Sequence, residues 1–526
     1  TGVIPGLKES TIIEKGRLGP GQMINVNLST GEFKDNIAIK KEISLRHDYT
    51  QWMKDHAVYV RSGGKDGVDF SHTDHRVFQN GQVSIMQSQF GWSLEDVTMQ
   101  INDMASTAKE TTYSMGDDAP LSVLSSRPHH LSNYFKQRFA QVTNPPIDPL
   151  REGIVMSLRM TLGKKQSINK VSYIGARLIH LESPFLNDKE LDYILDLPTF
   201  KSSSLSTRYD LSTGPAGLEA AVDDLTSAAV TAVKSGVEVI VLSDRPSPDQ
   251  PLQSTTYIPP NLAVGAVHHA LIAANVRMDT GIIVQTGAAW TTHHFASLIG
   301  YGAHAVHPYL ALETTKMWWE MPVTQSRMES GKMPTFTVEE AQSNLQTSIE
   351  NGLLKILSKI GISLLSSYHG AQIFEAVGLG EDVIGKAFKG TTSRIGGLSL
   401  PELALETVSM RPESHDETEV KKLVNYGYYK PVKSAEYHAN SADLARLLHD
   451  AIGLDKTMVG AKREEQIASG VPPAKQPNAA NYDIFKKSLE SAPLANIRDL
   501  LDFNSDRDPI PLSEVEPVEK IMERFC

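Results

Sequence analysis

The middle of the chain alternates between buried-strand patterns and amphipathic-helix patterns. Residues 237–244 form an apolar run rich in β-branched side chains, which is typical of a strand buried on both faces. Residues 217–235 place Ala and Leu between charged positions at helical spacing, and Gly236 follows as a helix-terminating residue. The order recurs downstream, with helices predicted over 262–275, 292–301 and 337–360 (with a small turn near Gly352) and strands over 281–286 and 303–306. It predicts βαβ units around a parallel sheet, either open and doubly wound or part of a barrel, and hence an α/β fold.

Shorter patterns flank this central region. Residues 23–28 alternate with a period near two, and the Ser-Thr-Gly-Glu sequence at 29–32 predicts a hairpin turn, so the chain starts with the end of a β-rich layer. From residue 411 onward, polar breaks containing Gly or Pro predict a connecting region that packs on the main domain. The remaining predicted elements are helices over 42–59, 94–104, 383–389, 399–406, 438–452 and 479–489 and a strand over 171–181.

Composition narrows the classes of protein to consider. At 526 residues the chain is long enough for two or three domains, and 40% hydrophobic residues are sufficient for sizeable buried cores. A formal net charge of −11, without basic runs, argues against a nucleic-acid or anionic-membrane partner. No apolar run approaches the roughly 20 residues that span a bilayer. The first residues lack both a Met and a signal-peptide pattern, so we expect a processed or excised piece of a longer protein.

Residues 102–152 contain an unusual density of positions that need a fixed backbone. The sequence Met-Gly-Asp-Asp-Ala-Pro at 115–120 has turn chemistry, and 134–140 is aromatic, basic and compatible with a helix. Residues 142–152 are not expected to form a helix interior, because each of three prolines within the five positions 145–149 removes an N–H donor and fixes φ. Taken alone, this pattern favours a rigid loop that spaces two elements.

The stretch 102–152 resembles the central domain of the large subunit of glutamate synthase. Other segments carry the resemblance in the family's order: 16–23 is similar to the end of the glutamine amidotransferase domain, 359–363 and 367–379 resemble a later central-domain signature, and 509–512 and 514–519 resemble the lead into the FMN domain. One position departs from the family, which more often has Arg where this chain has His369. The resemblance spans essentially the whole chain. It implies an amidotransferase end over 1–45, a connector over 46–80, a central α/β domain over 81–410 and a helical connector to the FMN domain over 411–526.

The resemblance implies a reaction that no single part of the enzyme performs. Glutamate synthase hydrolyses L-glutamine at an amino-terminal cysteine, and the ammonia crosses a tunnel to an FMN site, where 2-oxoglutarate is converted to L-glutamate. Electrons arrive through a three-iron, four-sulfur (3Fe-4S) cluster held by three cysteines, from a donor subunit or ferredoxin that contacts other regions. The family is cytoplasmic or lies in the plastid stroma.

The single cysteine limits what this chain can contribute. Cys526 is the only one, which rules out an intramolecular disulfide and a multi-Cys metal site. It lies where the resemblance places the start of the FMN domain, so neither the amidotransferase nucleophile nor the three cluster ligands are present. We therefore expect no catalytic residue, cofactor or metal in this piece, while the full-length enzyme would carry FMN and the 3Fe-4S cluster.

The role implied for this piece is to hold the two active sites in register and to form part of the ammonia tunnel. A tunnel needs small or apolar walls on a stiff backbone, and residues 142–146 have those properties. The resemblance places the tunnel mouth near this motif, which makes Thr143, Asn144 and Pro145 the candidate lining residues. A competing interpretation is that they only brace the amidotransferase interface. The structural loop residues implied on either side are Gly116, Asp117, Asp118, Asp148 and Arg151.

Two alternatives from other functional classes remain open. One is a self-sufficient flavin-dependent α/β oxidoreductase, in which the turns at Thr286-Gly287 and Gly302 would hold a phosphate at helix N-termini. The other is a non-catalytic α/β interaction scaffold. For the glycine turns themselves, close packing of helix on strand is the favoured interpretation.

Other polar clusters favour structural roles. Six histidines could suggest a metal, but adjacent histidines on a helix point about 100° apart, and no His-Glu-x-x-His motif or Cys pair accompanies them. They are His268, His269, His293, His294, His304 and His307. The pairs Lys109-Glu110 and Asp117-Asp118 favour a capped, salt-bridged loop over an acid/base pair. Asp244-Arg245, at the end of a predicted strand, favours an ion pair over a ligand site.

Overall fold

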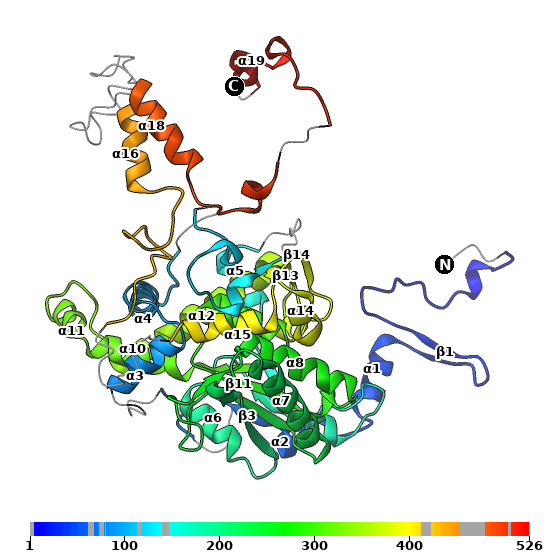
Figure 1. Ribbon diagram of the computed structural model, residues 1–526. Coiled ribbons are helices and arrows are strands. Elements are labelled where there is room, and N and C mark those ends of the chain that lie inside the picture. Colours follow the sequence, from blue (N-terminus) through cyan, green and yellow to red (C-terminus); the bar gives the residue numbers. More distant parts are fainter. Residues whose placement is uncertain are drawn as a thin grey trace.

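The structure, a computed structural model, describes residues 5–61, 68–72, 78, 80–112, 118–138, 147–411, 422–451, 479–502 and 506–524. Its centre is a four-stranded parallel sheet in the order β12-β11-β9-β7, of which Figure 1 labels β11. The strands are β7 (Ser202–Ser206), β9 (Val239–Ser243), β11 (Gly281–Gln285) and β12 (Ala305–His307). Ile240 pairs with Ile282 in register, and every residue of β9 is buried. The predicted α/β fold with a parallel sheet is confirmed.

Helices connect the parallel strands as the periodicity predicts. They are α7 (Gly217–Lys234), α8 (Pro260–Ala273) and α9 (Thr292–Gly300), and α7 packs along α8. Gly236, two residues after α7, has a φ of 92°, which suits glycine at a helix end. Each crossover therefore returns the chain to the same edge of the sheet, so the carboxyl ends of the strands lie together.

Three smaller sheets join segments that are far apart in sequence. β3 (Val58–Val60) pairs with β6 (Ile179–Leu181), which pairs with β5 (Met160–Leu162). β13 (Phe374–Leu379) lies between β14 (Thr392–Leu398) and β4 (Phe135–Gln137). β8 (Arg208–Asp210) pairs with β10 (Thr255–Tyr257).

A helical layer packs beside the main sheet. Its longest member is α12 (Val338–Ile360), which contacts α4 (Asn102–Thr107), α10 (Tyr309–Glu320) and α9. Thr337 and Glu340 form a reciprocal capping box at its start. The other helices of the main body are α3 (Asn80–Gln89), α5 (Pro149–Val155), α6 (Asp188–Leu195), α11 (Pro322–Glu329), α13 (Leu365–Tyr368), α14 (Glu381–Ala387) and α15 (Leu400–Ser409), and η2 (Asp96–Ile101) is a π-helical turn before α4.

The structure corrects several predicted elements. The turn predicted near Gly352 is absent, since α12 runs unbroken through this residue. Glycine at this position instead permits close packing of α12 on α9, because a Cβ there would lie 2.1 Å from Oγ1 of Thr292. The single helix predicted over 42–59 is wrong: α1 (Asn36–Ser44) ends before α2 (Tyr49–His56), whose N-terminus is capped by Asp48.

Two predictions fail near short 3-10 turns. The strand predicted over 171–181 begins as a 3-10 turn, Tyr173–Ala176, capped by Ser172, and only its last residues form β6. The segment 134–140 was compatible with a helix, but Phe135 to Gln137 form strand β4. Phe135 lies within 4.9 Å of the ring of Tyr301 and 4.8 Å of Phe388, so aromatic packing decides this conformation.

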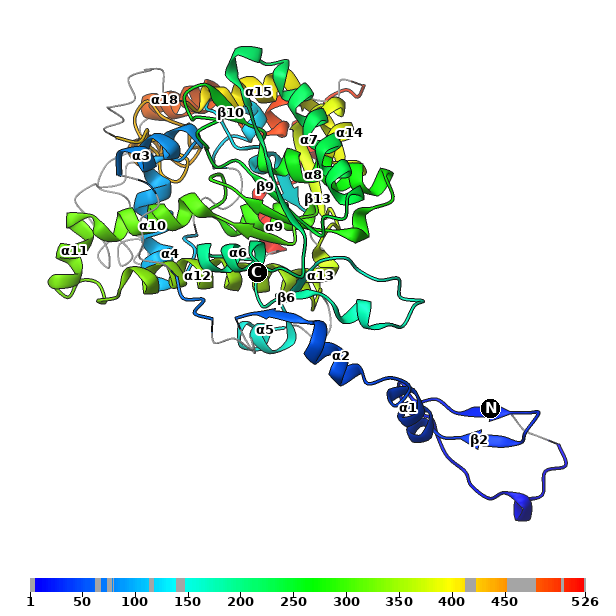
Figure 2. The same cartoon turned by 90° about the horizontal axis from the view of Figure 1, so that it is seen from below.

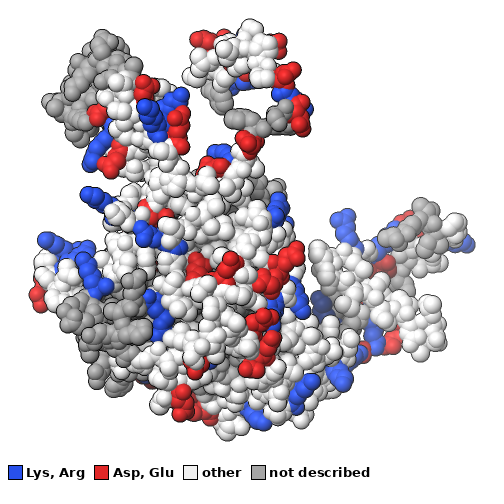
Figure 3. Space-filling view, viewed as in Figure 1, with Lys and Arg blue, Asp and Glu red and all other residues white. Residues whose placement is uncertain are grey.

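Both ends of the chain extend away from the main body in Figure 1, and Figure 2 shows the same for the N-terminal part. The predicted hairpin is confirmed as β1 (Asn25–Asn27) and β2 (Glu32–Lys34), and its apolar side chains Val26 and Phe33 are exposed. Near the other end, α16 (Ala442–Ala451) packs on α18 (Ala479–Glu490), and α19 (Val518–Glu523) follows. Lys, Arg, Asp and Glu side chains lie interspersed over the face in Figure 3. None of the helices in the described ranges combines the length and apolar character needed to cross a membrane.

Candidate functional site

A buried carboxylate occupies the carboxyl edge of the parallel sheet, where ligands bind in many α/β proteins. Asp244 follows β9 and is 2% exposed. Its side chain accepts hydrogen bonds from the hydroxyl of Thr286, from the Gly287 N–H at 3.0 Å and from the Tyr309 hydroxyl at 3.0 Å. Burial raises the pKa of Asp244 to about 6, although these three donors oppose the shift. The Asp244 carboxylate therefore links the end of β9 to the end of β11 through buried hydrogen bonds.

The glycines of the two candidate phosphate turns serve close packing, Gly287 at this edge and Gly302 before β12 at the amino edge. A Cβ on Gly287 would lie 2.8 Å from the ring of Phe90, which in turn packs 4.5 Å from the ring of Tyr257. Gly302, with a φ of 123°, would place a Cβ 2.5 Å from Nδ1 of His268. A phosphate would need the N–H that Gly287 donates to Asp244, beside a carboxylate that would repel it. The residues of the Thr286-Gly287 turn thus do not fit an FMN phosphate.

Arg245 and Asp244 do not pair as the sequence suggested. The Asp244 carboxylate accepts its hydrogen bonds from the neutral donors described above. The Arg245 guanidinium lies over the ring of Phe78 at 5.1 Å and that of Tyr309 at 5.9 Å. Within the described ranges, neither residue forms an ion pair.

The six histidines have structural partners. His304 Nδ1 accepts from the Ile282 N–H at 3.0 Å, and His294 Nδ1 accepts from the Trp290 N–H at 3.2 Å. Burial lowers the pKa of both rings well below the usual value, so both are neutral acceptors. The other contacts are His268 with Arg277, His269 with Gln372, His293 with the Ser132 carbonyl and His307 with Gln285 and Asp188. No cluster of three or more potential metal ligands occurs among the residues that the structure describes.

The predicted loop residues that the structure describes act as caps and clamps. Asp118 bonds His438 Nδ1 at 2.8 Å and accepts from the Asn440 N–H at 2.8 Å, which ties residues 438–440 to the main body. Burial would raise the pKa of Asp118, but these hydrogen bonds outweigh it and lower the pKa. Glu110 accepts from the Thr292 N–H at 3.2 Å. Gly116 and Asp117 lie outside the described residues.

The candidate tunnel residues Thr143, Asn144 and Pro145 also lie outside the described residues, but the chain on either side is anchored. Before them, the Arg138 N–H donates to the Ile373 carbonyl at 3.1 Å, at the end of the β4–β13 ladder. After them, Asp148 caps α5 by accepting from the N–H groups of Leu150 at 2.9 Å and Arg151 at 3.0 Å.

Helix α5 is itself held by α12, where the Ser358 hydroxyl donates to Glu152 at 2.7 Å. The described residues on either side of 139–146 are therefore bonded to the part of the chain between Ser358 and Phe374.

Two models of known families match the chain in succession. The model described as "Glutamine amidotransferases class-II" matches residues 1–52, and "Glutamate synthase central domain" matches residues 85–380, more than half of the chain. The chain belongs to the glutamate synthase central domain family. The central domain model therefore covers the parallel sheet, residues 139–146 and the signature near His369.

Curated relatives align over almost the whole of this glutamate synthase chain. A ferredoxin-dependent glutamate synthase 2 from Synechocystis is 44% identical over 99% of the chain, and the chloroplastic ferredoxin-dependent enzyme of Oryza sativa is 45% identical over 100%. The chain spans 32% and 31% of those two relatives, about a third of their length. The flavin-binding domain of baker's yeast flavocytochrome b2 aligns with 60% of the chain and 98% of its own length at 10% identity, with a TM-score of 0.28.

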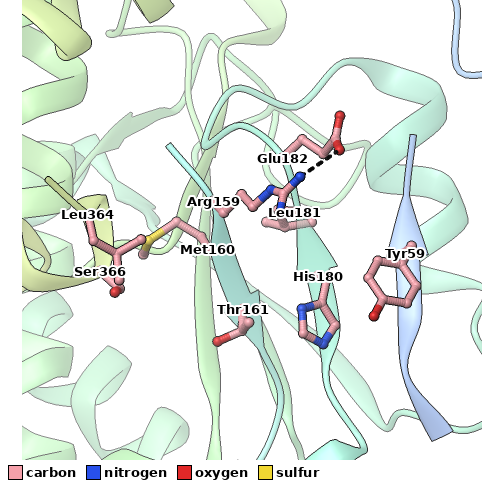
Figure 4. A pocket seen from close by; sticks show the side chains of 9 residues that line it. All are labelled: Tyr59, Arg159, Met160, Thr161, His180, Leu181, Glu182, Leu364 and Ser366. Carbon is pink, nitrogen blue, oxygen red and sulfur yellow. Dashed lines mark ion pairs between the residues drawn. The ribbon is translucent and has the colours of Figure 1, made fainter. Parts of the chain in front are cut away.

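Sequence analysis missed a groove of this glutamate synthase domain, about 360 Å³ in volume, on the outer face of sheet β3-β6-β5 (Figure 4). Thr161, His180 and Tyr59 stand opposite one another on the three strands, and the last two rings stack at 4.8 Å. Arg159 and Glu182 pair at 3.8 Å at its margin. Each strand has three residues, which is too short for alternation to reveal an outward-facing row.

Proposed function

We propose that this chain is the central part of a glutamate synthase, linking the glutaminase and FMN sites and forming part of the ammonia tunnel. The complete enzyme would make L-glutamate from L-glutamine and 2-oxoglutarate by ammonia transfer and reductive amination. It would carry FMN and a 3Fe-4S cluster outside this chain. The names of the relatives support ferredoxin as electron donor and the plastid stroma as one location.

The observation that carries this proposal is the order of the two family matches on one chain. An amidotransferase end over 1–52 leads directly into a central domain over 85–380. A segment that guides ammonia must hold its position relative to both active sites, because the molecule is small and escapes through any gap. The hydrogen bonds at Arg138 and Asp148 give segment 139–146 fixed ends.

The substitution Asn144→Ala in the complete enzyme tests the tunnel role. We expect glutamine hydrolysis to exceed glutamate formation by about twofold or more, because a changed tunnel wall releases ammonia to solvent while both active sites remain intact. The measurement compares the initial rates of the two activities in the same assay.

Asn169→Ala is the matched control, since Asn169 lies on an exposed loop outside the anchored segment. It should leave hydrolysis and synthesis coupled. A variant at Asn144 that keeps the two rates equal, or that loses both in proportion, would mean that the residue only braces an interface or the fold.

The competing flavin-dependent function has a separate test. After mixing with excess FMN and desalting, the chain is expected to show no visible flavin absorption, because the Gly287 N–H already donates to Asp244 and the ring of Phe90 packs against Gly287 at the Thr286-Gly287 turn. Stoichiometric retention of flavin would contradict the assignment of these glycines to packing. A Gly287→Ala variant that abolished retention would then locate the cofactor at this turn.

A further inference from the structure

A second cavity, about 570 Å³ in volume, opens at the amino edge of the parallel sheet. Thr280 and His304 lie just before β11 and β12, and His268 faces the cavity from α8. Ile272 and Met278 contribute to the lining and are 47% and 59% exposed, so the cavity is accessible from solvent. It lies at the opposite end of the strands from Asp244, since the strands are parallel.

Two cations line this cavity without a carboxylate partner among the described residues. The Arg277 guanidinium donates to His268 Nδ1 at 2.9 Å and to the carbonyls of Thr280 at 3.0 Å and Gly302 at 2.9 Å. His369 Nε2 lies 3.4 Å from the guanidinium, but it donates to the Gly302 carbonyl at 2.9 Å and therefore does not accept from Arg277. A guanidinium has five N–H donors, so at least one remains available.

Lys165 supplies the second charge. Its backbone N–H donates to the Met278 carbonyl at 2.8 Å, which holds the residue at the cavity, while its ammonium has no hydrogen bond or ion pair within the described ranges. Asp279, next to Met278 in sequence, is already paired with Lys164 at 3.0 Å. Lys164 therefore has a carboxylate partner, whereas Lys165 has none among the described residues.

Both charged side chains that line the cavity are cations. Burial lowers the pKa of Lys165, and Arg277 lowers it further. Burial, followed by the charge on Arg277, also lowers the pKa of His268 and of His369 to about 3. No carboxylate contributes to any of these shifts. The histidines are therefore neutral, and the two cations share a partly desolvated space in which no described residue supplies an opposing charge, which is unfavourable unless an anion enters.

We infer that this cavity binds a small oxyanion, a molecule bearing a carboxylate or phosphate group, between Lys165 and Arg277. The volume falls in the range of about 300–1,000 Å³ typical of small-molecule sites. Arg277 would offer its remaining N–H and Lys165 its ammonium, both as charge-assisted donors. The neutral imidazoles of His268 and His369 add polar walls without a repelling charge.

Calorimetric titration of the 526-residue chain with sodium phosphate and, separately, with sodium succinate tests this inference, with sodium chloride at equal ionic strength as reference. We expect at least one of the two oxyanions to bind, and Lys165→Gln to weaken that binding about tenfold, because one charge-assisted hydrogen bond is lost. Lys165 is part-exposed and free of side-chain bonds, so this variant should fold. Tighter binding of phosphate indicates a phosphate-bearing ligand, and tighter binding of succinate indicates a carboxylate-bearing one.

Lys164→Gln is the matched control, since it removes the same charge one residue away, outside the cavity lining. Its affinity for the oxyanion should stay close to that of the unaltered chain. The inference is overturned if neither oxyanion binds at about 10 mM, if chloride competes equally well, or if the two lysine variants weaken binding to the same extent.

Discussion

Replacing Asp244 with alanine is expected to lower the free energy of unfolding by about 3–5 kcal/mol, because three buried donors lose their acceptor at once. These donors are the hydroxyls of Thr286 and Tyr309 and the N–H of Gly287, and they come from the end of β11 and the start of α10. Urea unfolding followed by circular dichroism gives the measurement. A loss below about 1 kcal/mol would mean that water replaces the carboxylate.

The Asp244→Asn variant isolates the effect of charge. The pKa of Asp244 is raised from 3.8 to about 6 in the folded chain, so the folded state binds more protons than the unfolded state between those values. The contribution of Asp244 to stability is therefore greatest below about pH 4 and falls as pH rises through 6. Asparagine does not titrate, so the stability difference between the two proteins should change across that interval and be constant above it. A constant difference from pH 4 to pH 7 would contradict the raised pKa.

Replacing Gly265 with alanine is expected to destabilise the chain by about 2–3 kcal/mol, because overpacking outweighs the gain in helix propensity. Gly265 is buried in α8, where a Cβ would lie 2.3 Å from the backbone carbonyl oxygen of Ala387 at the end of α14. A backbone atom has no rotamer with which to move aside, so the two helices must separate. Thermal unfolding should show a lower midpoint.

Gly385→Ala is the matched control on α14. Gly385 is exposed, and nothing lies within 4 Å of its added Cβ. The same substitution there should stabilise the helix by about 0.5–1 kcal/mol, since glycine is the poorer helix former. If both variants shifted the midpoint in the same direction, close approach of α8 to α14 would not be what glycine provides at position 265.

Periodicity predicted the elements that are long and buried. The β-branched run ending at Ser243 and the amphipathic helix over 217–234 follow directly from residue spacing, and so do the strands and helices that repeat this order. The helices α10 and α11 were missed, although Pro308 and Pro322 stand at their starts. α10 is buried on nearly all sides, and its buried residues include polar ones such as Glu313 and Lys316, so its sequence offers no periodic contrast.

Elements that depend on distant partners gave no local signal. Strand β4 is fixed by pairing with β13, from Ala376 back to Phe374, more than two hundred residues away. Lys165 and Arg277 likewise come together only through the fold, and no spacing in the sequence connects them. The exclusion of helix over 142–152 was wrong at its end, because α5 begins at Pro149, where proline suits the first helical position and Asp148 caps the helix.

The pairing of β3 with β6 has a practical consequence for dissecting the protein. β3 precedes the range 85–380 that the family model matches, and Arg61 beside it bonds to Gln346 at 2.8 Å. At the other limit, β14 completes the sheet of β13 beyond residue 380. A piece expressed with only the matched range would leave two strands with open edges, and open edges recruit other chains. Aggregation of such a piece would reflect where it was cut, not an intrinsic insolubility of the central domain.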